Sequence, residues 1–200
     1  MADKEAGTFV NEKELKRKKR IKLAIYIAIF VVFQVIVITA FSLTVLKAKT
    51  PKFRLSDIEI KTLTRNTSSS PSFEVDITTK VKVKNTNFGA YKYDNSTVAF
   101  SYQGSSVGQV AIHKGKAGWL TTKNIDGVAV KLNYQALTNM TAASYLDNEL
   151  STGVLTLNGN GKMTGKVELI WIMKKKKSAE MNCTIAINVQ SQTIKSLECK

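Results

Sequence analysis

An uncharged run between Lys22 and Lys47 constrains this chain more than any other feature of its sequence. Residues 23–46 form a run of 24 residues. Its clearly polar members are Gln34, Thr39, Ser42 and Thr44. A helix needs about 20 apolar residues to cross a hydrocarbon core roughly 30 Å thick. A core helix of a soluble protein would show a polar stripe, and this run has none. The sequence therefore predicts a transmembrane helix over residues 23–46.

A cleaved signal peptide is the other use of an apolar run near an N-terminus. Its apolar region is about 7–15 residues long and ends at a small-residue A-x-A site. The run in this chain is longer, and residues 38–42 (ITAFS) offer no convincing cleavage pattern. We therefore expect an uncleaved signal anchor.

Basic residues on the two sides of the run predict its orientation. Residues 11–22 carry seven Lys or Arg residues, whereas the far flank, residues 47–54, carries four. The bias is modest, but a short tail before the run and a large domain after it favour the same orientation. We predict a cytosolic basic tail over residues 1–22 and an extracytosolic domain over residues 47–200.

The charge of residues 47–200 bears on the partners of that domain. These residues hold 22 Lys or Arg and 11 Asp or Glu, within a net charge of +15 for the chain. A basic surface favours contact with anionic lipid headgroups or acidic wall polysaccharide. The alternative is that the charge serves only solubility. Nucleic acid is not an expected partner, because the predicted topology places the domain outside the cytosol.

The chain has two cysteines, Cys183 and Cys199. Outside the cytosol an even number of cysteines favours a disulfide. The two lie symmetrically about Ser191, so a hairpin that turns near residues 190–192 would place them opposite each other. We predict a disulfide between Cys183 and Cys199.

Apolar and polar residues alternate through most of the chain after the run, which is typical of half-buried strands. Short runs of this kind are separated by Ser, Thr, Pro and Gly residues, as at 66–72. Strands are expected at 55–60, 73–77, 81–84, 97–103, 109–113, 128–133, 154–158, 166–173, 181–189 and 193–198. The fold expected is mainly β: one transmembrane helix followed by an antiparallel β-sandwich-like domain of about 7–9 strands.

Two segments carry separate predictions. The tetrapeptide Asn158-Gly159-Asn160-Gly161 is the strongest turn signal in the chain. Residues 134–150 have apolar residues spaced nearer 3.6 than 2, which favours one helix in the otherwise β domain.

The residues 104–108 (GSSVG) match the G-x-S-x-G nucleophile motif, with Ser106 at its centre. That motif requires a strand before the serine and a helix after it. Strand-like residues follow here, and the chain's only histidine, His113, comes without an acid between. We interpret the segment as a hairpin loop and expect no catalytic residue. With one histidine and no H-E-x-x-H or Cys/His cluster, we also expect no metal or cofactor.

Four N-x-S/T sequons follow the apolar run, and an extracytosolic domain would make them usable glycosylation sites. They begin at Asn66, Asn95, Asn139 and Asn182. Asn66 is favoured by its Ser-rich surroundings, and Asn182 is disfavoured by the adjacent cysteine. Chance would explain one or two of the four.

The run Lys174, Lys175, Lys176 and Lys177 lies between two expected strands. It is typical of a solvated hairpin tip. The sharper hypothesis is contact with anionic headgroups, to which each lysine near the surface adds about 1 kcal/mol.

Residues 85–98 (NTNFGAYKYDNSTV) resemble the N-P-N-x-x-x-x-x-Y-D-x-S signature of the plant late embryogenesis abundant group 2 family. The matching positions are Asn85, Asn87, Tyr93 and Asp94. The order of basic tail, helix, β domain and terminal cysteine pair resembles the membrane-anchored harpin-induced, hydroxyproline-rich-glycoprotein-like branch. Thr86 stands where proline is usual, and His113 stands where the family often has proline.

The resemblance implies a water-stress and hypersensitive-response domain, a small β-sandwich with one helix and no known catalysis. It also implies residence in the plasma membrane and a role in defence or stress responses. Asparagine tolerates turn geometry, so the signature is interpreted as a turn rather than a ligand site. The second functional hypothesis is a membrane-tethered lipid-binding or lipid-transfer module. An apolar cavity of pocket size between the sheets would favour it, and a close-packed interior would count against it.

Overall fold

The structure, a computed structural model, describes residues 2–45, 47–67, 70–136, 140–169 and 173–200. It divides into two compact units, residues 1–47 and 48–200. Each unit is described by itself below.

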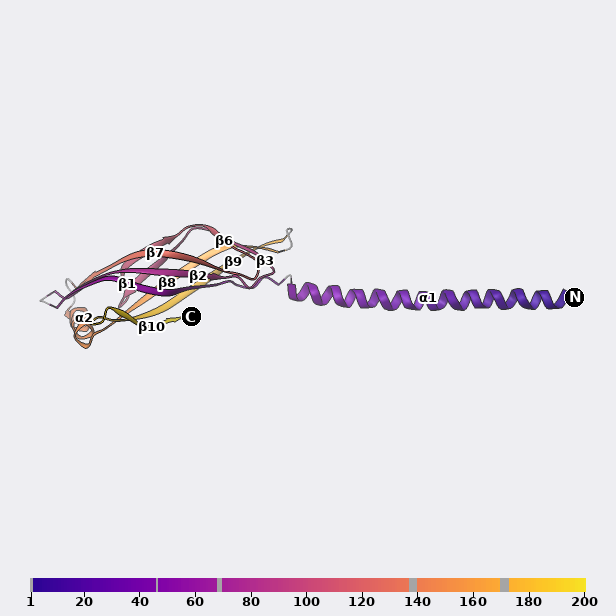
Figure 1. The fold of residues 1–200 in the computed structure, drawn as a ribbon, viewed down its shortest axis with the longest axis horizontal. Helices are drawn as coiled ribbons and strands as arrows, with labels where there is room; N and C mark the ends of the chain where they lie inside the picture. Colours follow the sequence, from indigo (N-terminus) through magenta and orange to yellow (C-terminus); the bar gives the residue numbers. More distant parts are fainter. Residues whose placement is uncertain (1, 46, 68–69, 137–139, 170–172) are drawn as a thin grey trace. The chain divides into compact units, whose positions relative to one another are not determined.

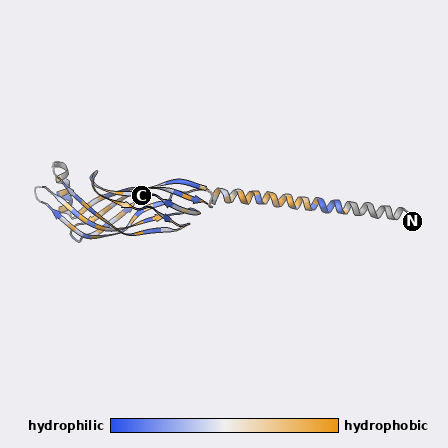
Figure 2. Ribbon diagram, turned by 90° about the horizontal axis from the view of Figure 1, so that it is seen from above, coloured by the Kyte–Doolittle hydropathy of each residue, from blue (hydrophilic) through white to orange (hydrophobic). Residues whose placement is uncertain are grey.

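The first unit is built on one helix, α1 (Ala2–Val45). Within it, Leu15–Leu43 is long and apolar enough to cross a membrane by length and composition, and none of its most apolar window is buried. Figure 2 shows the apolar stretch and the hydrophilic turns that precede it. The helix begins earlier than the expected residue 23, because the tail is rich in Glu, Lys and Arg, which are good helix formers.

The second unit is mainly β and antiparallel, as the sequence predicts (Figure 1). A three-stranded sheet has the order β1-β2-β7. A seven-stranded sheet has the order β10-β9-β8-β3-β6, with β4 pairing β8 and β5. The strands are β1 (Lys52–Asn66), β2 (Ser72–Lys84), β3 (Gly89–Tyr93), β4 (Ser96–Tyr102), β5 (Ser105–Ile112), β6 (Gly115–Ala117), β7 (Thr122–Gln135), β8 (Val154–Leu169), β9 (Met173–Asn188) and β10 (Thr193–Cys199). Ten strands are described. The expected ranges 73–77 and 81–84 form one strand, β2, while β3 and β6 match no expected range because they are too short for alternation to reveal them.

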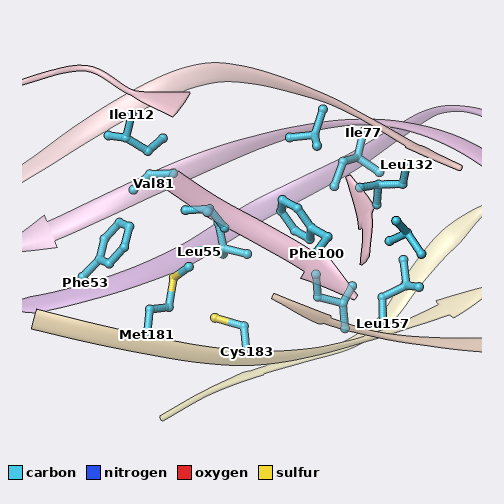
Figure 3. Close-up of a cluster of buried hydrophobic side chains, with 14 of the residues drawn as sticks. Phe53, Leu55, Ile77, Val81, Phe100, Ile112, Leu132, Leu157, Met181 and Cys183 are labelled. Atoms are coloured by element: carbon cyan, nitrogen blue, oxygen red, sulfur yellow. The ribbon is translucent and has the colours of Figure 1, made fainter. Parts of the chain in front are cut away.

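The core lies between the two sheets. On β2 every second residue from Phe73 to Val83 is buried, and on β9 the same holds from Ala179 to Ile187. Phe53, Leu55, Phe100, Leu157 and Met181 meet in this layer (Figure 3). Burying a side chain of this size stabilises the fold by about 1.5–3 kcal/mol. The alternation of apolar and polar residues in the sequence thus produces a two-layer sandwich whose interior is filled by apolar side chains.

The turn predicted at Asn158–Gly161 is wrong: these residues lie inside β8 and pair with β9 without interruption. A Cβ on Gly161 would lie 2.9 Å from Phe53 Cε1, and one on Gly159 would lie 3.4 Å from Phe100 Cε1. The two glycines therefore make room for aromatic rings in the core.

The helix expected over 134–150 is α2 (Met140–Thr152), because β7 continues to Gln135. Leu146 and Leu150 are buried against the sandwich. The helix ends at Gly153, whose φ is 80° and whose N–H donates to the Glu149 carbonyl at 3.0 Å. β8 starts directly after it, so α2 lies at the opposite end of β8 from Leu169.

Candidate functional site

Two buried asparagines of the family signature, Asn85 and Asn87, hold three backbone segments together. We call this pair the asparagine clamp. The Asn85 carboxamide Nδ2 donates to the carbonyl oxygens of Gly89 and Gly118, each at 2.7 Å. Its Oδ1 accepts from the backbone N–H and the Nδ2 of Asn87, at 3.1 and 2.9 Å. Both residues are at most 2 % exposed. Their polar atoms are satisfied within the protein, as buried groups require.

The clamp also fixes the place where the chain enters the domain. Asn87 Nδ2 donates to the Lys49 carbonyl at 2.9 Å, and the Lys49 N–H donates back to Asn87 Oδ1 at 2.5 Å. Lys49 lies four residues after Val45, the last residue of α1. The Leu120 N–H donates to the Asn87 carbonyl at 3.2 Å. The two asparagines therefore tie residue 49 to two loops, 85–88 and 118–121.

The other two signature residues, Tyr93 and Asp94, lie at the far end of β3. Tyr93 is buried, and burial raises its pKa. The Asp94 N–H donates to the Thr164 carbonyl at 2.9 Å, while its side chain is exposed. A Cβ on Gly115 would lie 2.4 Å from the Tyr93 hydroxyl, so glycine is needed beside the ring. The interpretation of the signature as a turn without a ligand stays a prediction.

Beside the clamp, four large apolar side chains are exposed: Phe88, Trp119, Leu120 and Met173. We call them the apolar cap. Trp119 is 62 % exposed and Leu120 52 %. The rings of Phe88 and Trp119 lie 6.2 Å apart, centre to centre. Met173 joins the group by register, because it pairs with Leu169, which pairs with Gly89. In the described part of residues 48–200, Tyr145 is the fifth exposed side chain of this kind.

The apolar cap was not predicted from the sequence. Phe88 and Trp119 are isolated aromatic residues in two loops, and only β3–β6 pairing brings those loops together. The available signal was the pair Trp119-Leu120 in a loop between polar residues, where turns seldom carry large apolar side chains.

The four lysines 174–177 follow Met173 inside β9 and pair with residues 165–168 of β8, so they do not form a hairpin tip. Lys176 stands in a row with Lys166, Lys92 and Lys116, one from each of β9, β8, β3 and β6. We call these four residues the lysine row; all are exposed. Like charges directly opposite on neighbouring strands destabilise a sheet. A row of four is therefore an unusual feature for a purely structural surface.

One carboxylate, Glu168, lies next to the lysine row. Its Oε2 is 2.9 Å from Lys92 Nζ, and its Oε1 is 3.8 Å from Lys174 Nζ. The hydrogen bond from Lys92, with the charges of Lys92, Lys174 and Lys116, holds the pKa of Glu168 below its usual value, despite partial desolvation. The positive charge of these lysines thus favours the ionised form of Glu168, near the end of β8.

The predicted sequons have different surroundings. Asn66 lies at the end of β1 and is exposed. Asn95 lies between β3 and β4, and its Oδ1 accepts the Lys114 N–H at 2.7 Å. Asn182 is exposed on β9, where its backbone pairs with Lys200. Asn139 lies outside the described residues. Glycosylation of these sites stays a prediction.

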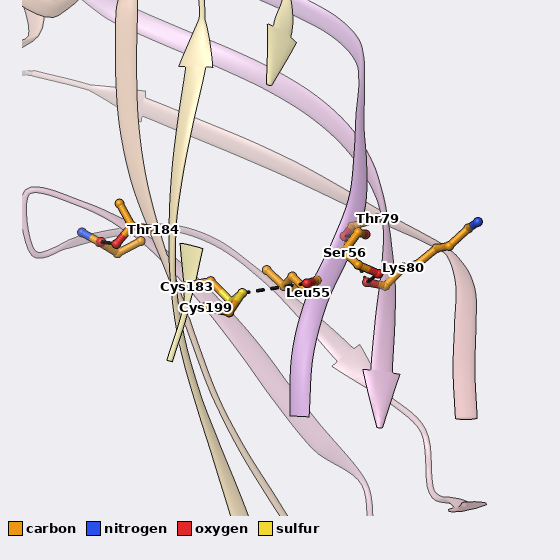
Figure 4. Close-up of a disulfide and its surroundings, with 8 residues drawn as sticks. Leu55, Ser56, Thr79, Lys80, Cys183, Thr184 and Cys199 are labelled. Carbon is orange, nitrogen blue, oxygen red and sulfur yellow. Dashed lines mark hydrogen bonds between the residues drawn. A yellow bond between two sulfur atoms is a disulfide. The ribbon is translucent and has the colours of Figure 1, made fainter. Parts of the chain in front are cut away.

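Cys183 and Cys199 form a disulfide across β9 and β10, with Cα atoms 4.1 Å apart (Figure 4). The neighbouring pair, Asn182 and Lys200, exchanges both backbone hydrogen bonds. The cysteines therefore occupy a non-hydrogen-bonded pair, where side chains approach most closely. Cys199 Sγ lies 3.8 Å from the Leu55 carbonyl oxygen, so the bridge also contacts β1.

The G-x-S-x-G segment lies in the β4–β5 hairpin. Gly104 has a φ of 82° in the turn, and Ser106 is an exposed residue of β5. A strand follows the serine where the nucleophile motif requires a helix. His113 is exposed after β5. No group of three His, Cys, Asp or Glu side chains suited to a metal ion occurs within the part of the chain that the structure describes.

Three hollows on the described surface show what its concave parts are lined by. One of about 450 Å³ is lined by residues including Asp94, Lys166 and Lys176 on the seven-stranded sheet. The others are lined mainly by polar residues near Asn182 and near Thr64. None of the three lies between the sheets. The interior there is filled by side chains such as Tyr91, Phe100 and Met163, all 0 % exposed.

These features define an antiparallel β-sandwich domain that follows an apolar helix and carries a buried asparagine clamp. In sequence the chain is 27% identical to the late embryogenesis abundant protein At1g64065 of Arabidopsis thaliana, over 156 residues. That match covers 74% of this chain and 71% of the relative, and it supports a late embryogenesis abundant family. No family model matches the chain.

Solved structures give weaker likenesses. The solution structure of At1g01470 from Arabidopsis thaliana has a TM-score of 0.37 at 14% identity. The matched region covers 70% of this chain and 84% of the chain of that structure. A crystal structure of a protein from Archaeoglobus fulgidus has a TM-score of 0.29 at 11% identity, over 64% of this chain and 94% of its own.

Proposed function

We propose that this chain is a non-enzymatic stress or defence protein, held in the plasma membrane by α1 and acting through its sandwich outside the cytosol. It would belong to the membrane-anchored harpin-induced branch of the late embryogenesis abundant group 2 proteins. The observation that carries the proposal is the pairing of an apolar helix with a disulfide in the unit after it. Disulfides persist in oxidising compartments, which lie on the non-cytosolic side of membranes.

The orientation follows from the same pairing. Basic residues of the tail favour a cytosolic N-terminus. A disulfide-bonded domain on the other side of α1 agrees with that orientation. The expected partners are other membrane or cell-wall components, and the lysine row and the apolar cap offer them a charged and an apolar surface.

Protease digestion of intact plant protoplasts tests the topology. The full chain carries one epitope tag before residue 1 and another after residue 200. We expect the C-terminal tag to be lost and the N-terminal tag to stay protected until the membrane is permeabilised. Protection of the C-terminal tag in intact cells would contradict the proposal.

Glycosidase treatment gives a second, independent readout. Peptide-N-glycosidase should lower the mass of the wild-type chain, and Asn66→Gln should remove one step of that change. The matched control is Thr67→Ser, which keeps the sequon. An unchanged mass would mean that the sequons are unused or that the domain does not reach the secretory lumen.

A role in stress or defence is tested by loss of the gene in a background without close paralogues. We expect altered responses to pathogen or drought challenge. Wild-type responses to both would contradict the functional half of the proposal and leave the topology standing.

The lipid-transfer alternative lacks the observation that would favour it. A carrier needs an apolar cavity of several hundred cubic ångströms. The layer between the sheets instead holds fully buried side chains, and the three hollows described above lie on the outer faces.

A further inference from the structure

The exposed apolar side chains of the sandwich are not scattered. Of the five on described residues after 47, four form the apolar cap at one end, and the fifth, Tyr145, lies on α2 at the other. Single exposed apolar residues are ordinary on protein surfaces, whereas a cluster marks an interaction site.

The apolar cap is tied to the point where the domain leaves its tether. Phe88 follows Asn87, and Asn87 exchanges two hydrogen bonds with Lys49. Lys49 lies four residues after the end of α1, and four extended residues span at most about 14 Å. If α1 crosses a bilayer, Lys49 is therefore held within that distance of the helix end, and the asparagine clamp bonds Lys49 to the loop that carries Phe88.

The charge around the apolar cap is almost entirely positive. Residues 48–53, 83–91, 116–123, 167–169 and 173–175 contain seven lysines and one acid, Glu168. The lysine row lies three residues further along β3 from Gly89, which is about 10 Å. Aromatic and apolar side chains bordered by lysines are the composition of surfaces that lie at a membrane interface.

We infer that the apolar cap rests in the interfacial layer of the same bilayer that holds α1, with the lysine row over anionic headgroups. This inference rests on the proposed anchoring of the chain. The asparagine clamp then has a function in positioning: it joins residue 49 to both apolar loops, so that the tether and the cap approach the membrane as one surface. Repulsion within the lysine row is relieved when headgroup phosphates lie against it.

The test uses the full chain in nanodiscs of phosphatidylcholine and phosphatidylglycerol. The chain has two tryptophans, so Trp171→Phe leaves Trp119 as the only reporter. The matched control is Trp119→Phe, Trp171→Phe and Tyr145→Trp, which places the reporter at an exposed site on α2. Lipids brominated near the headgroup end of the acyl chains quench tryptophans that enter this layer.

We expect bromolipid to reduce Trp119 emission about twofold, because interfacial groups lie about 5–10 Å deep, and to leave the control reporter unchanged. Co-migration of protein and disc is measured in the same samples. Loss of the chain from the disc would overturn both the proposed function and this inference. Retention on the disc with equal emission in both lipids would overturn the inference alone.

Two further outcomes are decisive. A blue-shifted Trp119 emission that bromolipid does not quench would mean that a protein surface, such as a second copy, covers the apolar cap, and would overturn the inference.

The lysine row is tested by Lys116→Gln with Lys166→Gln, against Lys131→Gln with Lys195→Gln as the control pair. We expect the first pair to weaken quenching in anionic discs and the second pair to leave it unchanged. Equal behaviour of the two pairs would overturn the part assigned to the lysine row.

Discussion

The two ends of the sandwich are closed in different ways. At the α2 end, the buried rings of Phe73 and Tyr102 lie edge to face at 5.6 Å, and Leu146 and Leu150 of α2 are buried. At the other end the asparagine clamp is a buried polar pair beside buried side chains such as Tyr91 and Leu169, and the rings of Phe88 and Trp119 are exposed. An end that served stability alone would resemble the first. Exposed rings at the second end are what the proposed contact with a membrane requires.

The largest effect is expected at the α2 end. Leu146→Ala should lower the free energy of unfolding by about 3–4 kcal/mol, because it removes a fully buried side chain and leaves a cavity. Urea denaturation of the chain in detergent measures the change. The control is Tyr145→Ala, an exposed neighbour on the same helix, with an expected change within about 0.5 kcal/mol. Similar losses for both would show that α2 packs differently.

A slightly smaller loss is expected at the clamp. Asn85→Ala should cost about 2–3 kcal/mol, because the carbonyls of Gly89 and Gly118 lose their donor in a buried site. The control is Asn95→Ala, whose exposed side chain makes one hydrogen bond to Lys114. If Asn85→Ala is as mild as the control, water reaches the clamp and the comparison of the ends fails.

The carboxyl groups of Glu149 and Glu168 allow the two ends to be compared by the pH dependence of stability. Desolvation by burial raises the pKa of Glu149 at the α2 end, although its carboxylate accepts the Thr156 N–H. A raised folded pKa contributes stability below the unfolded value, and that contribution is lost as pH rises through the folded pKa. Glu149→Gln should therefore stabilise the domain at neutral pH, by about 0.5 kcal/mol after screening by solvent. Thermal unfolding at pH 4 and pH 7 measures it, and a larger gain at pH 4 would contradict the sign.

The smallest effect, of the opposite sign, is expected for Glu168 beside the lysine row. Its lowered pKa contributes stability above the unfolded value, and that contribution is lost as pH falls through the folded pKa. Glu168→Gln should slightly lower the unfolding temperature at pH 7, and this difference should shrink as the pH falls through the folded pKa of Glu168. The pair is exposed, so added salt should shrink the difference. A difference independent of pH and salt would rule out the charge explanation.

Much of the sandwich could be predicted from the sequence, because a half-buried strand imprints its alternation on local residues. The symmetry of Cys183 and Cys199 about a turn likewise needs no knowledge of distant strands. The Asn158–Gly161 prediction failed for a tertiary reason: glycines favour turns locally, but here Phe53 and Phe100 need the space above a continuous strand. The local sequence does not indicate that an aromatic ring from another strand occupies the space beside a glycine.

The candidate site, like the fold, could be predicted from the sequence only in part. Asn85 and Asn87 were found through the family signature, and their interpretation as turn residues without a ligand stays a prediction. The apolar cap was missed, since Phe88 and Trp119 are 31 residues apart and meet only through the pairing of β3 with β6. The lysine row was seen only in part, at 174–177, because its other members come from three different strands.

The bond between Lys49 and Asn87 has a mechanical consequence. Tension on the tether enters the domain at Lys49 and passes into the first strand, β1, which is paired with β2 from Lys52 to Asn66. Ladder hydrogen bonds lie perpendicular to their strands, so a pull along β1 loads many of them at once in shear instead of opening them one by one. With the anchoring proposed above, a domain arranged in this way would resist being unravelled from α1 under load.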